Sequence, residues 1–152
     1  MAVALLAQVS VLHFFQLRGA TISAVLVVVV WYAIHADARR AAIFGLIAGL
    51  LEDGLATGTG GAWTISTTLV AIIAGVLSRG FFADSMPLVA GIVALCTLLR
   101  GMIYWMMMQA QGYPPGLGWL HFHQTLWQAL LNAAFIVGLM LVGRYREGYK
   151  LQ

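Results

Sequence analysis

Long apolar runs make up most of this chain, and short breaks of charged, polar and glycine residues separate them. The pattern predicts six helices. The first four runs are shorter than the roughly 20 residues that cross a bilayer upright, so we expect those helices to extend into their flanks or to cross a thin region lined by protein. The predicted spans are residues 2–17, 20–35, 41–56, 62–78, 86–108 and 121–143.

Composition assigns these helices to a membrane. Hydrophobic residues form 62% of the 152 residues and charged residues only 9%, with a mean hydropathy of +0.92. A soluble domain carries about a quarter charged residues, so this chain cannot cover its surface with charge. We therefore predict an all-α integral membrane protein, a six-helix bundle that forms a single transmembrane domain over residues 1–152.

The remaining composition excludes other classes. The formal charge of +3 is too small and too scattered to indicate nucleic-acid binding. The single cysteine, Cys96, excludes an intrachain disulfide. Nothing basic precedes the first apolar run, which argues against a cleaved signal peptide.

Basic residues predict the orientation. With six spans and both termini in the cytoplasm (N-in, C-in), the outer connections carry only Arg18. Short cytoplasmic loops of membrane proteins are enriched in lysine and arginine, so this asymmetry supports the assignment. The residues on the predicted inner side are Arg39, Arg40, Arg79, Arg144, Arg146 and Lys150.

The most informative stretch runs from Gly45 to Ala62, where small residues recur at every fourth position around two carboxylates. On a helix this spacing puts Gly45, Gly49 and Asp53 on one face, and Gly61 continues the series. A glycine stripe allows another helix to approach closely. A carboxylate beside it inside a membrane requires a partner.

Arg100 is the partner that depth predicts for Asp53. Asp53 and Arg100 lie about 18 and 21 Å from the cytoplasmic starts of their spans, at 1.5 Å per residue. Both therefore reach nearly the same level, and we expect an ion pair that fixes helix registry. Glu52 is rotated by about 100° from Asp53, so one partner does not serve both carboxylates equally. A proton relay would require acids at several depths, and the chain offers one level.

The last predicted helix carries a polar stripe formed by Gln124, Gln128 and Asn132. Such a stripe faces protein or water rather than lipid. Two interpretations stay open: an internal seam between helices, or a functional surface that lines an outward pocket or binds a partner helix.

The sequence lacks the motifs of catalysis and of cofactor binding. His121 and His123 are separated by about 200° around a helix, which disfavours a shared metal ion. Neither a phosphate-binding loop followed by lysine nor a His-Glu-x-x-His motif occurs. We predict a protein that is not an enzyme and that has no metal and no cofactor.

The stretch from Gly45 to Ala62 resembles the MreD family of rod shape-determining membrane proteins. The resemblance rests on Gly45, Gly49, Asp53, Gly61 and Ala62, with span number and length in agreement. It implies a non-catalytic, multi-pass scaffold in the bacterial inner membrane that helps to control peptidoglycan synthesis and cell shape. The implied partners are MreC, which contributes a single membrane helix, and, within a larger complex, RodA, a class B penicillin-binding protein and MreB.

Two further interpretations stay open. Chains of this size and span number are also similar to the solute-binding S-components of energy-coupling-factor vitamin transporters, whose fold a six-helix bundle would share. Against this alternative, the Ala-x-x-x-Ala docking motif of that family is absent from the first span, where Ala4 is followed four residues later by Gln8. The glycine stripe is also compatible with a homodimer, since it suits a second copy as well as MreC. Membrane lipid is the remaining expected partner.

Overall fold

The computed structural model describes residues 16–149, except 18, 57, 78–84 and 113. Most of the first predicted span lies outside the described residues, as do Arg18, Arg79 and Lys150 of the charge pattern. The described chain is almost entirely helical. Its elements are β1 (Gln16–Leu17), β2 (Ala20–Thr21), α2 (Ala24–His35), α3 (Ala38–Leu55), α4 (Ala62–Leu77), α5 (Met86–Ala110), the 3-10 turn η3 (Pro115–Leu117) and α6 (Gly118–Tyr149).

The region between the first two predicted spans differs from the prediction. Residues 16–17 and 20–21 form a short antiparallel hairpin, not helix, and Gly19 turns it with a φ of +80°. Helix α2 begins only at Ala24, because the Ser23 side chain accepts a hydrogen bond from the Leu26 amide and caps the helix. Local capping and a glycine turn therefore override the continuous apolar pattern.

The other predicted helices are present with shifted ends. Helix α3 begins at Ala38 rather than 41, because Asp37 caps it by accepting from the Arg40 amide. Helix α5 extends to Ala110, and α6 runs from Gly118 to Tyr149, well beyond the predicted 121–143. The polar residues near the ends of α6 misled the prediction, because they do not interrupt the helix.

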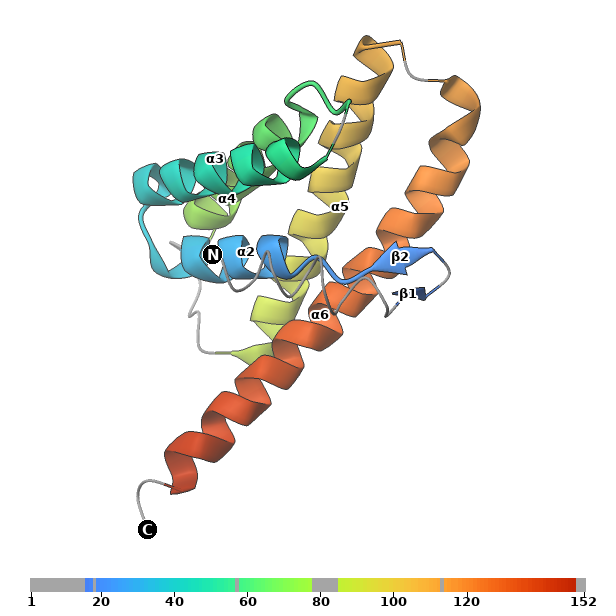
Figure 1. Cartoon of the computed structure of the whole chain (residues 1–152). Coiled ribbons are helices and arrows are strands. Elements are labelled where there is room, and N and C mark those ends of the chain that lie inside the picture. The colour runs from blue at the N-terminus through green and yellow to red at the C-terminus, as the bar shows by residue number, and fades with distance from the viewer. Residues whose placement is uncertain (1–15, 18, 57, 78–84, 113, 150–152) are drawn as a thin grey trace.

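The helices do not all run in the same direction. Helices α2, α3 and α4 pack together and run across α5, while α6 packs along α5 and crosses it obliquely (Figure 1). Helix α4 contacts both α3 and α5 and so joins the two groups. The described part of the chain holds five α-helices, and the predicted bundle of six is not confirmed by it.

Two of these helices, α5 and α6, are long and apolar enough to cross a membrane. Large aliphatic and aromatic side chains on α3, α4, α5 and α6 are exposed, while several polar and charged side chains are buried. A soluble domain rarely exposes so many large apolar side chains. This distribution is consistent with a helical membrane protein.

The core lies where α2 meets α4, α5 and α6. Helix α2 is buried along nearly its whole length, and its valines and leucine pack against α4 and α5. The C-terminal helix closes this core with Ile136. The polar groups described next lie within this same contact region.

Candidate functional site

Arg100 is buried and forms an ion pair with Glu52, not with Asp53. The guanidinium Nη2 lies 2.5 Å from Glu52 Oε2, and the two side chains are only 3% and 8% exposed. The predicted Asp53–Arg100 pair is therefore wrong. The neighbouring carboxylate, Glu52, makes the contact instead, because it faces α5 from α3.

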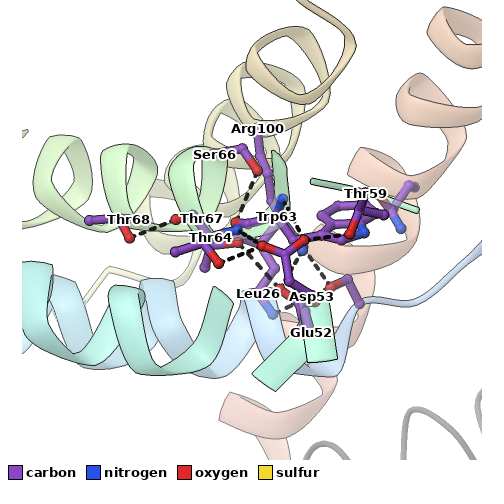
Figure 2. Close-up of polar contacts among 12 residues, drawn as sticks. Leu26, Glu52, Asp53, Thr59, Trp63, Thr64, Ser66, Thr67, Thr68 and Arg100 are labelled. Atoms are coloured by element: carbon purple, nitrogen blue, oxygen red, sulfur yellow. Dashed lines mark hydrogen bonds and ion pairs between the residues drawn. The ribbon is translucent and has the colours of Figure 1, made fainter. Parts of the chain in front are cut away.

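Asp53 instead caps the beginning of α4. Its carboxylate accepts hydrogen bonds from the Thr64 amide at 2.8 Å, the Trp63 amide at 3.2 Å and the Thr59 hydroxyl at 2.6 Å (Figure 2). The Thr64 hydroxyl also donates to it. The first amides of a helix have no partner within the helix, and an anion there is favoured by the helix dipole. Gly61, with a φ of +85°, gives the backbone the turn that leads into α4.

Two further groups hold the Arg100 guanidinium in place. Its Nη1 donates to the Ser23 hydroxyl at 3.0 Å, and its Cζ lies 4.3 Å from the centre of the Trp63 ring. The ring face attracts the cation and covers it. Arg100 Nε is buried and has no hydrogen-bond partner among the described residues. The same arginine thus contacts α3, α4 and the residue that caps α2.

The buried polar contacts continue from Ser23 to α6. The Ser23 amide donates to Asn132 Oδ1 at 2.9 Å, and Asn132 Nδ2 donates to the Thr97 hydroxyl at 3.1 Å. On the other side, the Thr67 hydroxyl donates to Glu52 at 3.3 Å. We call this set the polar network; it joins all five helices, and its members are Ser23, Glu52, Thr67, Thr97, Arg100 and Asn132.

The polar stripe of α6 faces the inside of the protein. Asn132 belongs to the polar network, and Gln128 Nε2 donates to the Thr21 carbonyl of β2 at 2.9 Å. Gln124 lies against the hairpin turn, where a Cβ on Gly19 would come within 3.0 Å of its side-chain nitrogen. Of the two interpretations of this stripe, the internal seam agrees with these contacts.

The glycine stripe of α3 is covered by α4. A Cβ on Gly45 would lie 2.6 Å from Ala71 Cβ, and one on Gly49 would lie 2.5 Å from Thr64 Cα. Both distances are far below normal contact, so only glycine permits this approach. The close helix packing expected from the stripe is present. However, the neighbour is another helix of the same chain, and the face is not open to a partner.

An aromatic column extends from Arg100 toward the turn between α5 and α6. Trp63 stacks on Tyr104 at 4.1 Å between ring centres, and His121 follows at 5.7 Å. His121 Nε2 donates to the Gly101 carbonyl at 3.0 Å, whereas His123 accepts from the Trp127 indole. The two histidines therefore have separate partners. In the part of the chain that the structure describes, no three His, Cys, Asp or Glu residues form a group suited to a metal ion.

Sequence reasoning identified Arg100 and Asn132 but missed Ser23, Thr67 and Thr97. Serine and threonine are common residues, and no sequence motif distinguishes these three from the others. Their role depends on which helices pack together. Glu52 was recognised as a buried carboxylate, but its rotation relative to Asp53 decided the pairing only once α3 was packed. The network as a whole binds helices to one another.

Comparison with protein-family models, with curated proteins and with solved structures finds no match for this chain.

Proposed function

We propose that this chain is a non-catalytic, multi-pass scaffold of the MreD type in the bacterial inner membrane. In this proposal it binds MreC and helps to control peptidoglycan synthesis and cell shape, with RodA, a class B penicillin-binding protein and MreB in the larger complex. The motif of Gly45, Gly49, Asp53 and Gly61 supports it, since each of these residues has a definite packing or turn role.

The observation that carries the proposal is the way in which polar groups are used. The members of the polar network bond to one another and tie five helices together, while the side chains exposed on the helices are mainly apolar. Such a molecule offers rigid apolar helix faces to lipid and to other membrane helices. A scaffold that binds a single-span partner requires this kind of surface.

The orientation belongs to the same proposal, with both termini in the cytoplasm and Arg144 at the cytoplasmic end of α6. The connection before α4 and the connection before α6 lie at one end of the molecule, because Gln111 Nε2 donates to the Thr59 carbonyl at 3.4 Å. Both connections were predicted on the outer side, and their proximity supports that assignment.

Co-purification tests the proposal. The full chain is expressed with the MreC-like protein of the same organism, and membranes are washed with alkaline carbonate before extraction in mild detergent. We expect the chain to stay in the membrane and to retain MreC. Leu50 on α3 and Leu130 on α6 are each 56% exposed, and the substitutions L50W and L130W put a larger side chain on each of these two faces. If only one of the two variants loses MreC, its face is the interface.

A different result would contradict the scaffold. If no MreC is retained by the wild-type chain, and the chain instead co-purifies with the ATPase and transmembrane subunits of an energy-coupling-factor transporter, the solute-binding alternative replaces it. Release of the chain by carbonate would contradict the membrane location itself.

A further inference from the structure

A cavity of about 200 Å³ lies between α5 and α6, near the turn that joins them. Leu98, Met102 and Trp105 form its wall on α5, and Phe122 and Leu126 form its wall on α6. These side chains are all apolar or aromatic. The polar network and its buried arginine lie outside this cavity, so it is a separate feature of the molecule.

Glycines shape this cavity. Gly101 contributes no side chain to the wall, and a Cβ there would collide with Thr125 on α6. Gly118 leaves space next to Trp105, whose ring would lie 3.2 Å from a Cβ at this position. The two long helices therefore stay close at these points, while the bulky residues between them surround a space.

The two polar residues in the wall direct their polar atoms away from the space. His121 Nε2 donates to the Gly101 carbonyl at 3.0 Å, and the Thr125 hydroxyl donates to the His121 carbonyl at 2.8 Å. The His121 ring also stacks on Trp105 at 5.2 Å. A water molecule in such a space would lack the two to four polar partners that hold buried water. The chemistry of the wall suits an aliphatic ligand.

The mouth of the cavity is continuous with the apolar outer surface of the same two helices. Met102, Phe122 and Leu126 line the cavity and are 58%, 52% and 43% exposed. Further exposed apolar side chains follow along α6, beginning with Leu130. These are the helices whose length and composition allow them to cross a membrane.

We propose that this cavity holds one aliphatic chain of a membrane lipid, inserted between α5 and α6 from the surrounding bilayer. The proposal rests on the membrane location proposed above. In a bilayer the exposed apolar surface is covered by acyl chains, and an apolar cavity that opens onto that surface is filled from it. The lipid would fix the separation of α5 and α6 near His121 and the aromatic column.

Photolabelling tests the lipid site. The full chain is reconstituted in phosphatidylcholine vesicles that contain a phosphatidylcholine with a diazirine in its acyl chain, and labelled residues are mapped by mass spectrometry. We expect labelling concentrated at Met102, Trp105 and Phe122. The variant L126W fills the cavity from α6 and lowers this labelling several-fold. The variant M102W fills it from α5 and has the same effect. L130W, one turn further along the exposed side of α6, is the matched control and leaves the labelling unchanged.

Three outcomes would overturn the lipid site. Labelling spread evenly over exposed positions such as Met106 and Leu139, and insensitive to both filling variants that still fold, means that lipid only surrounds the protein. Absence of labelling at every position means that the chain is not embedded, and then the membrane location fails together with the lipid site. Retention of the wild-type pattern by both filling variants likewise contradicts it. Size-exclusion profiles in detergent verify that the variants are folded.

Discussion

Glu52 and Asp53 are adjacent in sequence and have different roles. Glu52 points to Arg100 in the interior, and Asp53 points to the first amides of α4. The difference follows from the rotation of about 100° between neighbouring residues on a helix. A single step along α3 thus separates a buried charge pair from a helix cap, and the two carboxylates respond differently to substitution.

Replacing Arg100 with leucine is expected to destabilise the folded protein by about 3–5 kcal/mol, because Glu52 is left as an unpaired buried charge. The double variant E52L/R100L recovers part of this loss. The measurement is a double-mutant cycle of unfolding free energies in detergent. The cycle with D53L serves as the control, and we expect it to be nearly additive. Additivity for E52L would contradict the pair.

Replacing Asp53 with alanine removes the cap of α4. Its carboxylate accepts bonds from two backbone amides and from hydroxyls, so the expected loss is about 0.5–2 kcal/mol. Circular dichroism during thermal unfolding measures it. The D53N variant retains an acceptor and should lose less than D53A. Equal stability of D53A and wild type would show that the cap contributes nothing.

Among the described helices, α3 and α4 share the most extensive contact, and two glycines allow their close approach. Gly45 and Gly49 lie on the face of α3 that meets Ala71 and Thr64. Gly54 lies on the same helix with nothing within 4 Å of the position of a Cβ. The helix thus carries its own matched control for the effect of glycine on packing.

The variant G49A is expected to lose about 1–3 kcal/mol of stability, because its methyl group would overlap the backbone of α4. The variant G54A should be neutral or gain up to about 1 kcal/mol, since alanine favours a helix over glycine. Thermal unfolding of the two variants in the same detergent compares them. Similar behaviour of G49A and G54A would contradict the close contact.

At the scale of the molecule, one network of buried polar groups ties helices that run in different directions. Ser23 joins α2 to both Arg100 and Asn132, and through them α5 and α6 meet α3 and α4. Buried polar groups that are paired specify one arrangement of helices, because any shift leaves a group unpaired. The same arrangement puts the turn after α3 beside the turn after α5.

The proximity of these two turns is testable with cysteines. In a background with Cys96 replaced by alanine, G60C and Q111C are expected to react with each other through a short thiol crosslinker, because Gly60 lies against the Gln111 side chain. In the orientation proposed above, both cysteines should also react with an impermeant maleimide added from the outside. The pair G60C and V142C, at opposite ends, is the control and should not crosslink. Equal crosslinking of both pairs would contradict the arrangement.

Much of the element order could be predicted from the sequence, because long apolar runs between short polar and glycine-rich breaks indicate helices. Four of the predicted helices are present with ends shifted by a few residues, and α2 is shortened at its start. Ser23, Asp37 and Gly19 set these ends through caps and a turn. Such contacts depend on single side chains, and average hydrophobicity does not reveal them.

The residues of the polar network were predicted only in part, because their pairing depends on how the helices are rotated against one another. Arg100 was identified from its charge inside an apolar run, but depth along the helices selected Asp53 as its partner, whereas the contact is made by the adjacent Glu52. The decision between them required the rotation of α3 about its axis, which α4 controls through Gly45 and Gly49. The stripe on α6 was likewise recognised as polar, while its contact with β2 and α2 followed from the fold.

The sequence by itself determined that this is a chain of apolar helices with few charges, and that the arginine and carboxylates inside its apolar runs need partners. These properties depend on composition and on positions along one helix. Only the tertiary structure decided that Glu52 pairs with Arg100, that the glycine and polar stripes contact other segments of the same chain, and that an apolar cavity lies between α5 and α6. These properties depend on how helices are rotated and crossed, and that geometry results from many weak contacts between distant parts of the chain.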